Sequence, residues 1–537
     1  MKTYLSSDFN ISKNSDITRD FARILSNLRG EPGEKALIFE KGTYYLSSKN
    51  SSEYELYITN TIGEKEWEKN ENKNIHKVPI YIENISDLTI DFSGSTLVID
   101  GVTTNIVIKN SKNIKIENVE IITSNPNLHE LKVIDKKAFH VDYILDNESK
   151  YEKIKNKYYY VGTDYKLSFK YKLSKTWWIG DIKPNTPEKM KRTCHPFLGG
   201  IIKELEKNKF RVYYLNTKRF TKDELFYVFD TRRKDVGIFI DNSSCVTLYN
   251  LAQRFNYSLA IVCQHSKDLT FDKLDLTPNE DRKVVSLADF IQICMCSGKI
   301  VVKDSNFIGA CDDCLNVHGF HFKIVNTVGN KITVRFMHSQ SYGFIPFDKG
   351  DILAYIDSNT LLEKGRANVL DIKQINKYDI ELTVDNVLSE NMMVENVTKN
   401  PDLLFENNYL SRIITRGILV TTRGKVEILN NIFNYNTMSG VLISDDANNW
   451  YESGMVENVL IKGNRFCNTE EYDILIKPEN TKFEGFVHNN ITIVNNEFSS
   501  LNNGGIFVKD SGNVVIRDNI IKEKDFKITN KNSNKVK

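Results

Sequence analysis

The sequence Asp-Phe-Ile-Gln-Ile-Cys at 289–294 returns 24 residues later as Asp-Cys-Leu-Asn-Val-His at 313–318. Both segments alternate apolar side chains over a few residues, which is typical of a β-strand. Further copies of the pattern stand at 236–241, 258–263, 416–421, 439–444, 472–477 and 504–509. Most copies precede a second short strand and an Asn-rich turn, and neighbouring copies are often 22 to 24 residues apart.

Repetition at this period predicts a parallel β-helix, in which each coil stacks its strands on the next and none folds alone. The asparagines suit the left-handed backbone that tight corners require. An ordinary β-sandwich is the alternative, but its hairpin turns do not recur at so constant a period. We therefore predict an all-β protein built on a parallel β-helix.

The ends and interruptions of the repeat predict the domain organisation. An amphipathic helix within 15–29 carries apolar residues on one face, and we expect it to cover the open N-terminal end of the stack. We expect β-helix coils at 1–121, which include this cap, at 236–319, which carry the aspartates, and at 403–521.

Two stretches, 122–235 and 320–402, break the period and are rich in strand-like segments and turn signals. Both are predicted to be small inserted β-barrel-like domains. The second begins directly after His318-Gly319, so we expect it to form a wall of the site. The Lys- and Asn-rich residues 522–537 are predicted to be a disordered tail.

Composition excludes several classes of protein. The 537 residues carry 72 Lys and Arg against 70 Asp and Glu, so no excess charge favours nucleic acid or a membrane surface. The first residues lack the apolar stretch of a signal peptide. We therefore expect a cytoplasmic protein, or a secreted or cell-surface one if the N-terminus is truncated. Richness in Lys, Asn and Ile is typical of a low-GC bacterium.

Four cysteines, Cys294, Cys296, Cys311 and Cys314, form a C-x-C…C-x-x-C pattern. This spacing can hold zinc. We favour small buried residues on consecutive coils instead, because all four fall on or beside predicted strands. Their role stays open at this stage.

Three carboxylates meet when the coils are aligned by their apolar residues. Asp289 and Asp313 then stand at matching positions on adjacent coils, about 4.8 Å apart, with Arg416 on the next coil. Asp312 lies one residue away and projects differently. Adjacent carboxylates repel, so Asp312 and Asp313 suggest acid/base chemistry rather than a structural role.

Inverting glycoside hydrolysis requires such an arrangement: an acid for the leaving oxygen, and a base for water on the opposite face of the sugar, about 6.5–9.5 Å apart. Crowding of negative charge keeps one proton on the cluster, and we assign that proton to the general acid. A calcium site is the alternative, but Arg416 and His318 are poor neighbours for a cation.

Three motifs resemble glycoside hydrolase family 110: GACDDCLNVHG at 309–319, TRGILVTTRGKV at 415–426 and VLISDDANNWYESG at 441–454. The resemblance covers about 30 to 520. It implies a right-handed parallel β-helix with β-barrel inserts, and an α-1,3-galactosidase that removes terminal galactose, including that of the blood group B determinant. It places the acid on Asp312 and the base pair on Asp289 and Asp313, and it implies no metal cofactor.

The remaining candidates are substrate-binding residues. Arg416 is expected to hold the base pair ionised and to contact substrate. Trp450 can stack on a sugar, and Asp445 can bind hydroxyl groups, although both also suit a packed loop. His318 either binds substrate or packs under the second insert.

The predicted function is an inverting exo-glycosidase acting on glycans with terminal α-galactose, linear Galα1-3Gal or blood group B-type. The alternatives are another β-helix α-glycoside hydrolase of polygalacturonase type and a non-catalytic carbohydrate-binding protein. We predict no nucleic-acid or membrane partner. A homodimer, the choice between linear and fucosylated substrates, and the choice between Asp312 and Asp313 as acid are left open.

Overall fold

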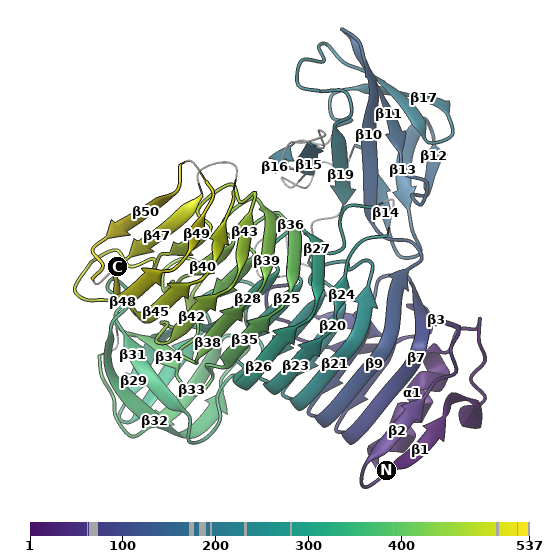
Figure 1. Cartoon of the computed structure of the whole chain (residues 1–537). Helices are drawn as coiled ribbons and strands as arrows, with labels where there is room; N and C mark the ends of the chain where they lie inside the picture. Colours follow the sequence, from purple (N-terminus) through teal and green to yellow (C-terminus); the bar gives the residue numbers. More distant parts are fainter. Residues whose placement is uncertain are drawn as a thin grey trace.

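The computed structural model describes residues 1–61, 63, 73–170, 177–181, 189–193, 196–229, 233–279, 282–389, 391–500, 504–523 and 525–534, with backbone only at 177–181 and 189–193. Most of these residues form one parallel β-helix that runs from the N-terminus to the C-terminus (Figure 1). The predicted fold class is confirmed.

One sheet of the β-helix consists of short strands, each contributed by a different coil. Its strands pair in parallel along the whole solenoid, and in the order of the stack they are β6 (Ile80–Glu83), β8 (Ile106–Lys109), β20 (Ile238–Asp241), β22 (Ile261–Gln264), β25 (Ile291–Cys294), β28 (Leu315–Phe320), β37 (Ile418–Val420), β40 (Val441–Ile443), β44 (Ile474–Ile476), β47 (Gly505–Lys509) and β50 (Lys527–Lys531). We call it the site sheet. A short strand from another part of the chain, β41 (Glu452–Ser453), pairs antiparallel with β28.

The remaining coil strands form a second, larger sheet in which most coils contribute two strands on either side of a corner. Its described members are β1 (Lys2–Leu5), β2 (Lys35–Ile38), β3 (Thr43–Ser47), β7 (Ser86–Asp100), β9 (Lys112–Thr123), β21 (Ser244–Gln253), β23 (Lys267–Asp272), β24 (Asp275–Leu276), β26 (Ser297–Lys303), β27 (Asn306–Ala310), β35 (Asp402–Glu406), β36 (Tyr409–Ile413), β38 (Val426–Leu429), β39 (Ile432–Asn436), β42 (Val459–Lys462), β43 (Arg465–Cys467), β45 (His488–Val494), β46 (Glu497–Phe498), β48 (Ser511–Arg517) and β49 (Ile520–Ile521).

Alternation along each strand fills the interior of the solenoid. Ile291, Leu315, Ile418 and Val441 point inward from successive rungs of the site sheet and are fully buried. On the second sheet, Phe433 and its neighbours in the stack lie with nearly parallel rings. Since each coil buries its apolar residues only against adjacent coils, the period of the sequence becomes the period of the stack.

The Asn-rich turns form a ladder inside the corner of the second sheet. The backbone N–H of each asparagine donates to the side-chain oxygen of the next at 2.8–2.9 Å, in the order Asn408, Asn431, Asn464, Asn496 and Asn519. The residues directly before several of them have a left-handed backbone, namely Asn407, Asn430 and Asn495. The predicted role of Asn at tight corners is confirmed, and the buried amides also satisfy the backbone there.

The N-terminal end is covered as predicted. Helix α1 (Thr18–Arg29) follows β1 and a single 3-10 turn, η1 (Ser6–Phe9), and buries Phe21, Ile24, Leu25 and Leu28 against the first coils. The hairpin β4 (Ser52–Glu55) and β5 (Ile75–Val78) lies nearby in the chain. No helix among the described residues combines the length and apolar character needed to span a membrane.

In its described residues, the first insert forms two sheets and not the predicted barrel. Its larger antiparallel sheet is ordered β16 (Lys189–Thr193), β15 (Trp177–Asp181), β19 (Leu225–Phe229), β10 (Leu128–Lys136), β11 (His140–Leu145), β18 (Lys209–Tyr213) and β17 (Ile201–Glu206). The smaller sheet holds β12 (Tyr151–Ile154), β13 (Lys157–Val161) and β14 (Lys166–Ser168). Aromatic residues of both sheets share one apolar core, so the described part of the insert buries its faces without closing.

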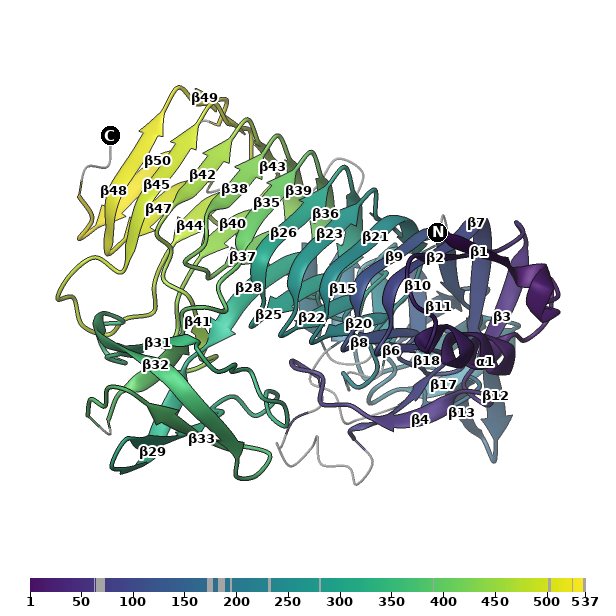
Figure 2. The ribbon, with the colours of Figure 1, turned by 90° about the horizontal axis from the view of Figure 1, so that it is seen from below.

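The second insert is a closed barrel of six strands, which confirms the prediction. Going round the barrel, the strands are β29 (Phe322–Val328), β30 (Lys331–Arg335), β33 (Asp379–Val384), β32 (Glu363–Gln374), β31 (Ile352–Ile356) and β34 (Met393–Asn396). The barrel lies beside the C-terminal half of the solenoid (Figures 1 and 2), whereas the first insert extends from the other side in Figure 1.

The prediction of a disordered tail at 522–537 is wrong for its described residues. β50 continues the site sheet by pairing in parallel with β47, and residues 535–537 lie outside the described residues. The composition of the tail did not predict this strand. An exposed sheet edge presents unpaired backbone N–H and C=O groups, and a polar segment can pair with them through its own backbone.

Candidate active site

Three rungs of the site sheet bring the predicted residues together. The parallel register of β25 with β28, and of β28 with β37, puts Asp289, Asp313 and Arg416 at equivalent positions on successive coils. The N–H of Phe290 donates to the carbonyl of Asp313 at 3.0 Å, in keeping with this stacking. These residues and Asp312 line one cavity of about 640 Å³.

Asp313 is buried and strongly bound. It accepts hydrogen bonds from the Thr415 hydroxyl, from the backbone N–H of Arg416 at 3.0 Å and from Arg416 Nη2 at 2.9 Å. Burial raises the pKa of Asp313 to about 6, against the opposing effect of the Arg416 guanidinium. Arg416 thus favours the ionised form of this carboxylate.

Asp312 pairs with Arg233, which donates through Nη2 to its Oδ2. Thr415 Oγ1 lies 3.3 Å from the other carboxylate oxygen. Burial favours the neutral carboxyl, but the guanidinium groups of Arg233 and Arg416 outweigh it and hold the pKa of Asp312 below its usual range.

Asp289 is buried beside the other two carboxylates, and its surroundings favour its neutral form. Only 2% of it is exposed, and its Oδ1 has no hydrogen-bond partner among the described residues. Burial, followed by the nearby charges of Asp312 and Asp313, raises its pKa well above the usual value. The sequence analysis assigns the shared proton to the general acid, Asp312. Arg233, which the coil alignment does not include, favours the ionised form of Asp312 in this structure.

His318 does not line the cavity, which corrects one of the two alternatives. The side chain is buried, its Nδ1 donates to the carbonyl of Gly319 at 2.8 Å, and its Nε2 accepts from the Gln292 amide at 2.9 Å. Nε2 is also 3.7 Å from Glu452, which does line the cavity. His318 therefore lies next to the cavity wall, beside Glu452, without reaching the cavity itself.

Polar groups beside the aspartates remain available to a ligand. Asn316 lines the cavity and donates to Glu452 at 3.1 Å, while its Oδ1 is buried without a partner among the described residues. Glu452 reaches this position because β41 pairs with the end of β28. An unpaired buried acceptor and a carboxylate are suitable partners for sugar hydroxyls.

Asp445 also lines the cavity and receives a hydrogen bond of 2.6 Å from His321 Nε2. Both side chains are buried. The negative charge of Asp445 raises the pKa of His321 despite the opposing effect of burial. His321 lies between β28 and β29, so this contact joins the cavity wall to the base of the barrel.

Trp450 stands at the rim, with 58% of the residue exposed. Asp446 fixes the turn before it by accepting hydrogen bonds from the backbone N–H groups of Asn448, Asn449 and Trp450. The indole lies 5.3 Å from the His338 ring of the second insert. The segment is thus built to hold an aromatic face beside the cavity.

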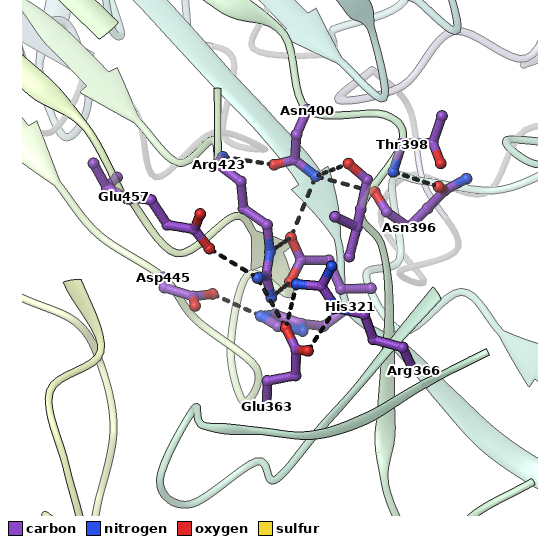
Figure 3. A network of polar contacts seen from close by, with 12 residues as sticks. His321, Glu363, Arg366, Asn396, Thr398, Asn400, Arg423, Asp445 and Glu457 are labelled. Carbon is purple, nitrogen blue, oxygen red and sulfur yellow. Dashed lines mark hydrogen bonds and ion pairs between the residues drawn. The ribbon is translucent and has the colours of Figure 1, made fainter. Parts of the chain in front are cut away.

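The barrel supports the wall rather than forming it, since none of its described strand residues lines the cavity. A charged network links the two parts (Figure 3). Arg423, which follows β37, donates to Glu395 of β34 at 2.9 and 3.0 Å and to Glu363 of β32 at 3.0 Å. The network lies beside the Asp445–His321 pair and fixes the barrel against this side of the β-helix.

The four cysteines do not share a site. Cys296 and Cys314 belong to the solenoid core, whereas Cys294 packs with the barrel and Cys311 with a cluster near the first insert. The thiols are buried and in the free form. Their distribution favours the packing interpretation over a zinc site.

Arg233 and Glu452 are among the cavity residues that the coil alignment does not include. Arg233 lies between β19, the last described strand of the first insert, and β20, and Glu452 lies in a strand that runs against the coils. Neither has an equivalent on a neighbouring rung. Only the motif VLISDDANNWYESG, which contains Glu452, gave any signal for them.

The fold and the cavity define a parallel β-helix protein with a buried cluster of carboxylates on its site sheet. Two family models match the chain: "GLAA-B beta-barrel domain II" at residues 331–397 and "Right handed beta helix region" at 394–537. The first covers most of the barrel and the second the C-terminal coils.

Curated relatives extend the similarity to most of the chain. "Alpha-1,3-galactosidase A" of Bacteroides thetaiotaomicron is 33% identical over 509 residues, which are 91% of this chain and 87% of the relative. "Alpha-1,3-galactosidase B" of Phocaeicola vulgatus is 26% identical over 568 residues, which are 97% of this chain and 92% of the relative. The chain belongs to the α-1,3-galactosidase family, glycoside hydrolase family 110.

Proposed function

We propose that this protein is a glycoside hydrolase that removes terminal α-1,3-linked galactose from glycans. One observation carries the proposal: three aspartates from two adjacent rungs line a single cavity in a chain of the α-1,3-galactosidase family. The cavity also offers Asn316 and Glu452 to sugar hydroxyls.

Inversion is the mechanism that this cluster favours. Asp312 donates a proton to the glycosidic oxygen as the bond from that oxygen to C1 of galactose breaks. Water held by Asp289 and Asp313 attacks C1 from the opposite face and gives its proton to this pair. Galactose leaves as the β-anomer, and the shortened glycan carries the donated proton as a hydroxyl.

The cluster must redistribute its proton before this step. In this structure Asp312 is paired with Arg233, which lowers the pKa of Asp312, whereas burial raises the pKa of Asp289. Entry of the sugar removes water and displaces Arg233 from Asp312, so that the single proton moves from Asp289 to Asp312. Asp289 and Asp313 then share the role of base, and Arg416 stabilises their negative charge.

Asp445, Arg416 and Trp450 bind the substrate in this proposal. Asp445 accepts hydrogen bonds from galactose hydroxyls while His321 fixes its orientation. Trp450 provides an aromatic face at the rim, where the sugar next to galactose leaves the cavity.

The test is hydrolysis of linear Galα1-3Gal and of its fucosylated form, followed by proton NMR. We expect β-galactose to appear first in the wild type and Asp312→Asn to be inactive but folded. Initial release of α-galactose would contradict inversion. Absence of hydrolysis of every α-1,3-galactoside, with polygalacturonate cleaved instead, would contradict the substrate.

A further inference from the structure

A row of apolar side chains extends from the active-site cavity along the outer face of the site sheet. The register pairs Leu419 with Leu442, Leu442 with Leu475, and Leu475 with Phe507. Leu419 and Leu442 line the active-site cavity, whereas Leu475 and Phe507 line a second cavity of about 680 Å³. The two cavities therefore lie on the same sheet over one continuous row.

The second cavity combines aromatic rings with charged groups. The rings of Tyr472 and Phe507 lie with their centroids 5.4 Å apart, and both side chains are partly exposed. Glu471, Lys477 and Asp525 lie around them in the cavity wall. Aromatic faces pack against the C–H faces of sugars, and carboxylate and ammonium groups bind hydroxyls, so this composition suits a carbohydrate.

An ion pair connects the walls of the two cavities. Lys477 in the second cavity is paired at 2.9 Å with Glu479, which lines the active-site cavity. Tyr472 stands on its rung where Arg416 stands two rungs earlier, because Ile418 pairs with Val441 and Val441 with Ile474. A ligand that leaves the active site along the sheet thus reaches the second cavity directly.

We propose that the second cavity binds the sugars on the leaving-group side of the substrate, so that the enzyme recognises several units beyond the terminal galactose. This inference rests on the proposed function. Phe507 lies three rungs from Leu419, a distance of about 14 Å at the usual strand spacing. A chain that follows the row places its third or fourth sugar over Tyr472 and Phe507, so the substrates are oligosaccharides rather than disaccharides.

The test compares kcat/KM for the disaccharide Galα1-3Gal with that for a pentasaccharide that ends in the same disaccharide. Wild type, Phe507→Ala and Tyr472→Ala are assayed, with Phe139→Ala, an exposed phenylalanine of the first insert, as the matched control. We expect Phe507→Ala and Tyr472→Ala each to lower kcat/KM about tenfold for the pentasaccharide and less than about twofold for the disaccharide. The control should match wild type on both.

Equal losses on both substrates, or no loss on either, would overturn the inference. Calorimetry separates this failure from failure of the proposed function. The pentasaccharide is titrated into Asp312→Asn and into the double variant Asp312→Asn/Phe507→Ala, which needs no turnover. Weaker binding by the double variant supports a sugar-binding role of the second cavity even if hydrolysis is absent. Equal or undetectable binding by both variants overturns the inference.

Discussion

Arg233 donates to Asp312 from a segment 79 residues earlier in the chain, and this contact helps to hold the pKa of Asp312 below its usual range. The guanidinium groups of Arg233 and Arg416 outweigh burial and lower the pKa of Asp312, whereas burial and the charges of Asp312 and Asp313 raise the pKa of Asp289. The first insert therefore influences the catalytic cluster through the segment by which the chain returns to the solenoid.

Replacing Arg233 should move the pH dependence of the reaction. Loss of its positive charge in Arg233→Gln makes every carboxyl of the cluster hold its proton more tightly. Because the general acid must be protonated, the alkaline limb of kcat/KM should move to higher pH, by about one unit. Arg233→Lys keeps the charge and should stay near the wild-type profile. An unchanged limb in Arg233→Gln would show that Arg233 does not act on the acid.

Substrates whose leaving groups differ in their need for a proton distinguish the general acid from the base among the three aspartates. A nitrophenolate leaves without a proton, so Asp312→Asn should lose about a thousandfold in kcat on Galα1-3Gal but far less on nitrophenyl α-galactoside. Asp289→Asn and Asp313→Asn should lose activity equally on both substrates, because attack by water needs the base in either case.

A reversed result would reassign the acid. If Asp289→Asn retains activity on the nitrophenyl substrate and Asp312→Asn does not, the proton donor is Asp289, the group whose pKa burial raises. Circular dichroism and thermal unfolding of each variant exclude loss of the fold as the cause.

The sequence was sufficient for the solenoid because each coil repeats the same requirement. Apolar residues at matching positions predict the register of β25, β28 and β37, and therefore the stacking of Asp289 and Asp313. The first insert and the tail were less accessible. Nothing in a period-breaking stretch distinguishes a closed barrel from two packed sheets, and β50 forms through its backbone rather than through an apolar pattern.

The site shows the same division. Residues on the rungs were predictable, whereas Arg233 and Glu452 come from segments without coil equivalents. His318 illustrates a further limit: it lies two residues after Asn316 on the same face of β28. Asn316 lines the cavity, whereas the His318 ring is buried against Gln292 and the carbonyl of Gly319. The strand pattern predicts the face that a side chain occupies, but not the neighbours that cover it.

Glu130, a buried carboxyl at the base of the first insert, should make stability depend on pH. Only 5% of it is exposed, and burial raises its pKa from 4.5 to about 7 although Arg282 opposes the shift. The unfolded chain therefore loses this proton first as pH rises above about 4.5. Stability should decline between about pH 4.5 and 7 and level off above, at a total cost on the order of 3 kcal/mol.

Glu130→Gln removes that titration while it keeps an acceptor for the N–H of Lys283. The melting temperature of the variant relative to wild type should be higher at pH 8 than at pH 5. Glu206→Gln, at an exposed position of the same insert, should show no such difference. A constant difference between Glu130→Gln and wild type at both pH values would contradict the linkage.

The asparagine ladder should be a main source of stability in the C-terminal coils. Asn464 is buried, accepts from the backbone and the amide of Asn431 at 2.9 Å, and donates to the carbonyl of Ile428 at 2.8 Å. Asn464→Ala leaves these buried groups unpaired, so we expect a loss of about 2–4 kcal/mol in the free energy of unfolding. Asn434→Ala, which removes a half-buried amide of the same region, should cost less than about 1 kcal/mol. Chemical denaturation measures both, and equal losses would show that burial of the ladder adds nothing.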